Sequence, residues 1–223
     1  FATKEYCLSN FIENVLTESD KMTIIADSVD HKLRQFVDRS EAANIEILHE
    51  TLGSNGASFR FQIDFATSLP DGEIVMFQED DYLYMPANWP YRTNTTYHEL
   101  INEALDFAEY VSFYDHPDKY LSPKFGGNKY ITDQGVENTG IFRTENSHWK
   151  YTNSTTCTFA TTAKVIKQDQ KIWNAFCAGN HPHDFQSFLA LGIRGRALAT
   201  ALPGKSTHTE MPWLSPFFEQ NFI

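Results

Sequence analysis

Residues 73 to 81 read EIVMFQEDD, an apolar run that leads directly into three carboxylates. The four consecutive apolar residues Ile74 to Phe77 are typical of a strand that is buried on both faces. A second apolar run, Tyr82 to Met85, follows the carboxylates. We expect residues 74–77 to form a buried strand and the acidic run to lie at its carboxyl end.

The acidic run Glu79-Asp80-Asp81 has the chemistry of a metal site. In open α/β sheets, ligands bind at the carboxyl ends of the strands. Three adjacent carboxylates repel one another unless a cation relieves them, and Mg²⁺ or Mn²⁺ takes oxygen ligands of this kind. The alternative is a solvated acidic turn. We favour a Mn²⁺ or Mg²⁺ site, because a solvated turn rarely lies between two apolar runs.

Strand and helix signals alternate in the first part of the chain. Strands are predicted at Met22 to Ala26 and at Ile45 to His49, from short runs rich in apolar residues. Helices are predicted at Asp30 to Ser40 and at Ser54 to Ser68, where apolar residues recur on one helical face. Together with the strand at residues 74–77, this order predicts parallel strand pairing and an α/β fold.

The second half of the chain is less regular. Gly140 to Thr144 and Thr156 to Thr161 are expected as antiparallel strands at a sheet edge, because they are rich in β-branched and aromatic residues. The other elements predicted here are helices at Thr96 to Tyr110, Ala163 to Cys177 and Asp184 to Leu191, and strands at Val111 to Tyr114 and Arg196 to Leu202. No clear linker interrupts the chain, so we predict a single domain over residues 1–223.

The composition narrows the class of partner. The formal net charge of −11 argues against a nucleic acid as the partner, because a protein that binds the phosphate backbone needs a basic surface. A small phosphorylated ligand is still compatible, since a metal ion supplies local positive charge. Cys7, Cys157 and Cys177 lack metal-ligand spacing and are expected as free thiols in a reducing compartment. No run of about 18 apolar residues occurs, so we expect no transmembrane segment and a cytoplasmic protein.

Several positions along residues 20 to 215 resemble, in the same order, the GT-A fold nucleotide-sugar glycosyltransferases, in particular family-2-like members. The strand ending in an acidic run resembles their Asp-x-Asp motif. Asp27-Ser28 is similar to the end of their first nucleotide-binding strand, and the small residues 53–58 to the helix start that follows the second. Asp184 and His208 stand where these enzymes carry a late carboxylate and a C-terminal metal-binding histidine. Size and pattern also resemble the small glycosyltransferase domains of large DNA viruses.

The resemblance implies a fold and an activity. The fold would be a mostly parallel central sheet flanked by helices, with a nucleotide-sugar-binding half at about residues 20–115 and a less regular acceptor-binding half at about 116–215. The activity would be transfer of a hexose from a nucleoside diphosphate sugar, UDP-type favoured, to a carbohydrate or other hydroxyl acceptor, with inversion.

The resemblance also implies roles for individual residues. Asp184 would be the catalytic base, although an Asp at this position is also a common helix N-cap. The metal would be held by Glu79, Asp81 and His208, although a histidine in a loop is also common on a polar surface. The residues expected to bind the donor are Asp27, Ser28, Asn55, Asp80, Arg194 and Arg196, of which the two arginines could pair with a diphosphate or be surface charges.

Two other functions compete with this interpretation. A sugar-phosphate nucleotidyltransferase should have a Gly-rich loop with a basic residue after the first strand, whereas residues 27–30 read DSVD. The second is a non-catalytic carbohydrate-binding protein on the same fold. For a sugar-stacking ring, Trp149 and Trp213 are the best-placed tryptophans.

Overall fold

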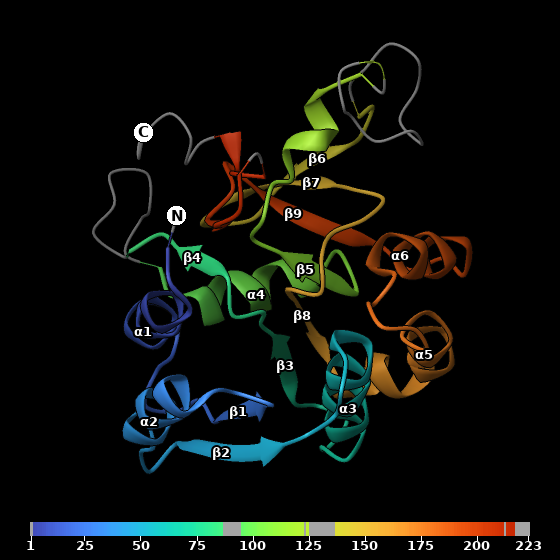
Figure 1. The fold of residues 1–223 in the computed structure, drawn as a ribbon. Coiled ribbons are helices and arrows are strands. Elements are labelled where there is room, and N and C mark those ends of the chain that lie inside the picture. The colour runs from blue at the N-terminus through green and yellow to red at the C-terminus, as the bar shows by residue number, and fades with distance from the viewer. Residues whose placement is uncertain (1, 87–94, 123, 125–136, 212, 217–223) are drawn as a thin grey trace.

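The predicted buried strand is present as β3 (Ile74–Phe77) in a computed structural model. The structure describes residues 2–86, 95–122, 124, 137–211 and 213–216 (Figure 1). Phe77 is buried against Phe59 and Phe159, with ring centroids 5.6 and 5.0 Å away. The strand at residues 74–77 is therefore confirmed, but Ile74, Val75 and Met76 are only partly buried and β3 lies at the edge of a six-stranded sheet, so the prediction that the strand is buried on both faces is wrong.

The first strand–helix–strand unit is confirmed. β1 (Met22–Asp27) and β2 (Ile45–Glu50) pair in parallel, and α2 (His31–Arg39) connects them. The helix begins after Asp30, whose carboxylate accepts the backbone N–H of Leu33 at 2.8 Å. α3 (Asn55–Thr67) follows β2, close to the predicted range.

The main sheet has six strands in the order β3-β8-β5-β9-β7-β6. In the part of the chain that the structure describes, β5 and β9 are its parallel pair, and the other four neighbouring pairs are antiparallel. The prediction of a mostly parallel sheet is therefore wrong, although the α/β class is right. The strands besides β3 are β5 (Tyr110–Ser112), β6 (Ile141–Arg143), β7 (His148–Tyr151), β8 (Phe159–Thr162) and β9 (Leu198–Leu202).

The position of β8 explains this error. Its segment was expected at a sheet edge, but β8 lies between β3 and β5 and runs antiparallel to both. Phe159, Ala160 and Thr161 are almost completely buried, so both faces of the strand are covered. β6 does lie at the edge of the sheet, as predicted.

Helices cover the sheets in two groups (Figure 1). α5 (Ala163–Phe176) packs between α3 and α6 (Asp184–Ile193) on one side of the molecule. α1 (Lys4–Asn14) contacts α2 and β4 (Tyr82–Tyr84) on the other side, and α4 (Tyr97–Leu105) packs against β5. None of the described helices is both long and apolar enough to cross a bilayer.

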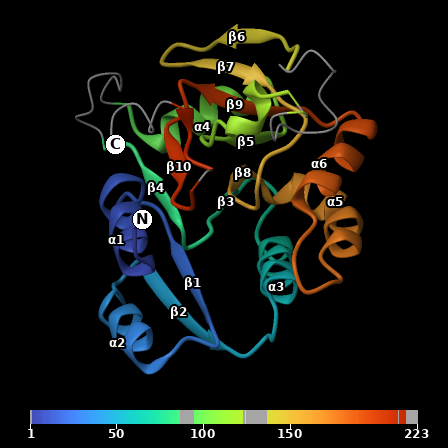
Figure 2. The ribbon, with the colours of Figure 1, turned by 45° about the horizontal axis from the view of Figure 1, so that its top comes forward.

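A short ribbon joins the acidic run to the C-terminal part of the chain. β4 pairs antiparallel with β10 (Ser206–His208), and His208 lies opposite Tyr82 in the register (Figure 2). The backbone N–H of Thr209 donates to the carbonyl of Asp81 at 2.9 Å, which extends the pairing by one step. The ribbon thus fixes the backbone on both sides of the predicted metal site.

Candidate functional site

The structure brings two of the predicted metal-site residues into contact. Nε2 of His208 lies 3.1 Å from Oδ2 of Asp81. Adjacent ligands of one octahedral ion, with bonds of about 2.1 Å, are about 3 Å apart, so these two atoms could share a cation. The other oxygen of Asp81, Oδ1, is buried and makes no hydrogen bond to any described group. A buried carboxylate oxygen without a donor is the kind of atom that a cation satisfies.

Protons compete with a cation at this pair. Nδ1 of His208 accepts the backbone N–H of Glu210 at 3.1 Å, which puts the imidazole proton on Nε2, facing Asp81. Burial lowers the pKa of His208, but the hydrogen bond to Asp81 and the charges of Asp81 and Glu79 outweigh it, so the pKa is raised overall. A metal at Nε2 would have to displace this proton.

Glu79 adds a second carboxylate beside the pair. The hydroxyl of Thr158 donates to Oε2 of Glu79 at 3.0 Å, and the backbone N–H of Glu79 donates to the same hydroxyl at 3.2 Å. Burial and the charges of Asp81 and Asp184 raise the pKa of Glu79 to about 7. Thr158 was not predicted, because it is one of several threonines in residues 154–162 and nothing in the sequence distinguishes it from the others.

The protein side chains alone do not make a full metal cage. Within the described ranges, no group of three or more His, Cys, Asp or Glu side chains is arranged to hold an ion. Mg²⁺ is usually bound through one or two carboxylates together with substrate phosphates. An ion held by Asp81 and His208 would have to take its remaining ligands from a bound diphosphate and water, and the histidine favours Mn²⁺ over Mg²⁺.

Asp184 lies at the start of α6, within electrostatic range of the acidic run. The N-cap position belongs to His183, which makes no side-chain capping bond, so Asp184 is the first helical residue rather than the cap. Oδ1 of Asp184 accepts the backbone N–H of Phe185 at 2.6 Å. Burial raises the pKa of Asp184, and the Phe185 N–H, His116 and His183 offset this in part. A raised pKa makes this carboxylate a stronger base than an exposed Asp.

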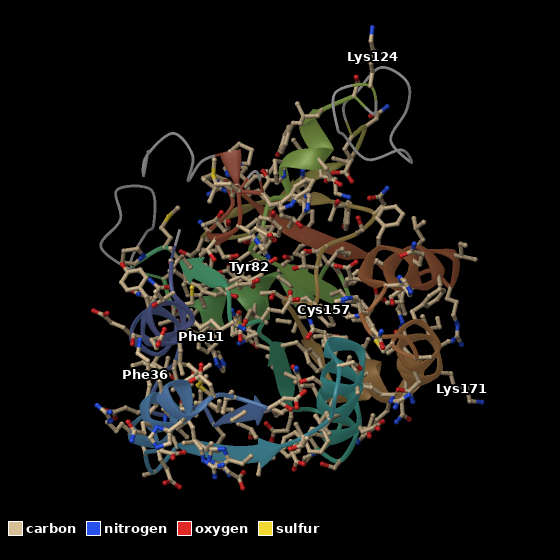
Figure 3. All side chains as sticks on the ribbon, viewed as in Figure 1. Phe11, Phe36, Tyr82, Lys124, Cys157 and Lys171 are labelled. Atoms are coloured by element: carbon tan, nitrogen blue, oxygen red, sulfur yellow. The ribbon has the colours of Figure 1, made fainter. Side chains whose placement is uncertain are left out.

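Buried side chains lie next to these carboxylates. Tyr82 and Cys157 lie in the central part of the molecule, whereas Lys171 projects from α5 at the surface (Figure 3). The Tyr82 hydroxyl donates to Thr156 at 2.7 Å. Burial, followed by the charges of Glu79 and Asp184, raises the pKa of Cys157, so this cysteine stays a thiol.

The predicted nucleoside contacts lie together at the carboxyl end of β1. Oδ1 of Asp27 accepts the backbone N–H of Leu52 at 2.8 Å and the hydroxyl of Ser28 at 2.9 Å. Ser28 has a φ of 54°, in the left-handed region that a non-glycine residue rarely adopts. Asn55 is the first residue of α3, directly after the capping residue Ser54. These residues form one corner, where the loops after β1 and β2 meet.

A backbone contact connects this corner to the segment before Asp184. The N–H of Gly56 donates to the carbonyl of Asn180 at 3.1 Å. A Cβ atom at Gly56 would lie 2.2 Å from the carbonyl oxygen of Gly179, so only glycine allows this approach. The start of α3 and the α5–α6 loop are therefore held against each other.

Three of the residues predicted to bind the donor lie away from both the Asp81–His208 pair and the corner at the end of β1. Arg196 pairs with the buried Asp169, with Nε 2.7 Å from Oδ2, and Arg194 lies at the opposite end of α6 from Asp184. The carboxylate of Asp80 points outward and pairs with Lys4, and its side chain is 60% exposed. The two arginines therefore belong to the far end of α6, and Asp80 to the surface.

Aromatic residues that the sequence did not connect lie beside the cluster. The ring of His208 packs edge-on against Tyr82, with centroids 5.1 Å apart, and Tyr114 lies next to both. Trp149 is fully buried in the core, whereas Trp213 is 38% exposed. Of the two tryptophans predicted to stack on a sugar, only Trp213 has an accessible face.

Comparison with known proteins gives no relative to guide the assignment. No protein-family model matches the chain, and no curated protein is significantly similar to it in sequence.

Proposed function

We propose that this protein is a metal-dependent glycosyltransferase that moves a hexose from a nucleoside diphosphate sugar to a hydroxyl acceptor. The observation that carries the proposal is the Asp81–His208 pair, in which one buried carboxylate oxygen makes no hydrogen bond to any described group. The pair lies where the segment between β3 and β4 meets the end of β10. The resemblance of the ordered motifs to GT-A enzymes supports the same class.

The donor would lie between the β1 corner and the acidic run. Asp27, Ser28 and Asn55 would contact the nucleoside, for which a UDP-type donor is favoured. Asp81 and His208 would hold Mn²⁺ or Mg²⁺, with Glu79 adding negative charge. When bound, the ion would supply positive charge for the leaving diphosphate.

The acceptor would be activated by Asp184. A hydroxyl is a poor nucleophile until its proton leaves, so an inverting transferase needs a base on the acceptor side. Burial raises the pKa of Asp184, which makes it a stronger base than an exposed Asp, and its backbone hydrogen bond at the start of α6 fixes its orientation. The proton of the acceptor hydroxyl would pass to the free carboxylate oxygen during attack at the anomeric carbon.

One structural feature argues against the nucleotidyltransferase alternative. In a nucleotidyltransferase, the loop after β1 would bind the phosphates at an uncapped helix N-terminus. Here the N-terminus of α2 is already capped by the carboxylate of Asp30. A second negative charge would therefore be repelled from this position.

A thermal-shift screen tests the proposal directly. Wild-type protein is heated with nucleoside diphosphates and their sugars, with and without Mn²⁺. A ligand bound at 100 times its Kd adds about 2.7 kcal/mol to the free energy of unfolding, which raises the Tm of a protein of this size by about 5–10 °C. We expect a shift only when nucleotide and metal are both present. Tm values that stay constant across the whole panel would disprove the proposed function.

A further inference from the structure

A row of rings leads away from the Asp81–His208 pair. The ring centroid of His208 lies 6.5 Å from that of Tyr114, and Tyr114 lies 5.1 Å from His116. The row ends at Trp213, whose ring centroid is 5.4 Å from that of His116. The hydroxyl of Tyr114 donates to the backbone carbonyl of Trp213 at 2.5 Å. The row thus connects the candidate metal pair to an exposed indole.

His116 is oriented by a neighbouring carboxylate. Its Nδ1 lies 2.7 Å from Oδ1 of Asp118, and the two side chains are 21% and 17% exposed. The backbone N–H of Asp118 donates to this nitrogen at 3.1 Å. Nδ1 is therefore an acceptor, so the proton of the neutral imidazole lies on Nε2. The Nε2–H group can donate a hydrogen bond to a ligand.

The loop that carries Trp213 is anchored on its C-terminal side. Leu214 and Ser215 are buried, and the backbone N–H of Ser215 donates to the hydroxyl of Thr207 in β10 at 2.8 Å. A large indole face held in place at low entropic cost is a good platform for a ligand with an apolar face. The C–H face of a pyranose ring is such a ligand.

Asp184 is within electrostatic range of residues at both parts of this arrangement. Its carboxylate interacts electrostatically with Glu79 on the metal side and with His116 on the ring side. A hydroxyl that reaches Asp184 from the Trp213 side would therefore face a donor held from the opposite side. The excess of carboxylates in the cluster would repel an anionic acceptor, so a neutral ligand is favoured.

We infer that Trp213 and His116 form the acceptor subsite, and that the acceptor is a neutral carbohydrate. One face of its pyranose ring would stack on Trp213, and the Nε2–H of His116 would donate to one of its hydroxyl oxygens. This inference rests on the proposed function, because it assigns the acceptor side of the same site. It adds two binding residues and excludes an anionic or purely aliphatic acceptor.

Saturation-transfer NMR tests the subsite without turnover. The probes are the methyl glycosides of glucose, galactose, mannose and N-acetylglucosamine, with UDP and Mn²⁺ present. We expect at least one probe to give signals with the wild type and none with Trp213→Ala. His116→Ala should weaken its binding by about 3- to 10-fold, the scale of one neutral hydrogen bond. Phe65→Ala is the matched control, because Phe65 is 37% exposed, like Trp213, but lies near the end of α3.

The outcomes distinguish a failure of the acceptor subsite from a failure of the proposed transferase function. Equal signals from the wild type and Trp213→Ala, or no signal from any probe, would overturn the subsite. In either case a thermal shift by UDP with Mn²⁺ would leave the transferase proposal standing. The absence of that shift would refute the transferase itself, whatever the glycosides do.

Discussion

His208 and Asp81 come from opposite halves of the chain, yet Nε2 of the imidazole lies 3.1 Å from the carboxylate. The antiparallel pairing of β4 with β10 produces this contact by setting His208 opposite Tyr82, one residue after Asp81. A surface histidine or a solvated turn would not need such a fixed partner. The strand pairing therefore gives the acidic run a fixed partner, His208.

Replacing Asp81 should separate metal binding from folding. Asp81→Ala removes the carboxylate that faces His208, so Mn²⁺-dependent binding of a nucleoside diphosphate should be lost. Calorimetric titration measures this loss. Asp80→Ala is the control, because Asp80 lies in the same run but points to solvent, and its titration should match the wild type. Unchanged affinity in Asp81→Ala would rule out Asp81 as a ligand.

Replacing His208 should weaken the metal and the diphosphate together. A lost ligand or its immediate support typically costs about 10-fold or more in metal affinity, so His208→Ala should show at least that loss for both components. His49→Ala provides a control, because His49 also contacts a carboxylate, that of Asp38, at 2.8 Å on the surface. If the two variants differ from the wild type only in Tm, the histidine has a structural role.

Asp184 should be needed for turnover but not for donor binding. Asp184→Asn keeps an oxygen that can accept the Phe185 N–H but cannot take up a proton. Turnover should therefore fall by about 10²-fold or more, with donor affinity and Tm close to those of the wild type. Transfer rates and calorimetry on the same preparation check this. If Asp184→Asn turns over at the wild-type rate, Asp184 is not the base, and Glu137 and Glu145 are the next candidates.

The metal-free protein should become more stable as the pH falls from about 8 to 6. The pKa of Glu79 is raised to about 7, and those of Asp184 and His208 are also raised. The folded state therefore binds more protons than the unfolded state between roughly pH 5 and 7, so stability decreases as the pH rises through that window. Differential scanning calorimetry should show a higher Tm at pH 6 than at pH 8. Glu79→Gln should flatten the dependence of Tm on pH. A steeper dependence in this variant would contradict the raised pKa of Glu79.

Arg196 should matter for stability and not for the ligand. Its guanidinium neutralises Asp169, whose side chain is only 2% exposed. Arg196→Ala would leave that charge buried, at a cost of about 3 kcal/mol in the free energy of unfolding. Urea denaturation measures the loss, and donor affinity should stay unchanged. Arg194→Ala, at the exposed end of α6, should alter neither quantity. A selective loss of diphosphate affinity in Arg196→Ala would return this residue to the donor site.

Local patterns in the sequence predicted the elements whose burial follows a simple period. The apolar run of β3 and the one-sided helix α2 are found close to where their residues place them. β8 was misplaced because its β-branched and aromatic residues predict a strand but do not tell an edge strand from a central one, and the strand is buried on both faces. β4 and β10 have three residues each, too few for a periodic signal.

The site was predictable only in its separate parts. The chemistry of the acidic run identified Asp81, and the resemblance to GT-A enzymes identified Asp184 and His208 as candidates. The contact of Asp81 with His208 depends on strand pairing between distant segments, which no local pattern specifies. The same limit applies to Arg196, since a partner on α5 decided whether its charge was available.

The close approach of Gly56 to the carbonyl of Gly179 couples the start of α3 to the loop that precedes Asp184. A substitution that shifts either backbone would displace both. In the proposed transferase, nucleotide recognition and base placement would therefore be coupled in evolution. Trp213 lies outside this contact, on a loop anchored to β10, so under the same proposal acceptor preference would be free to change through the C-terminal loop.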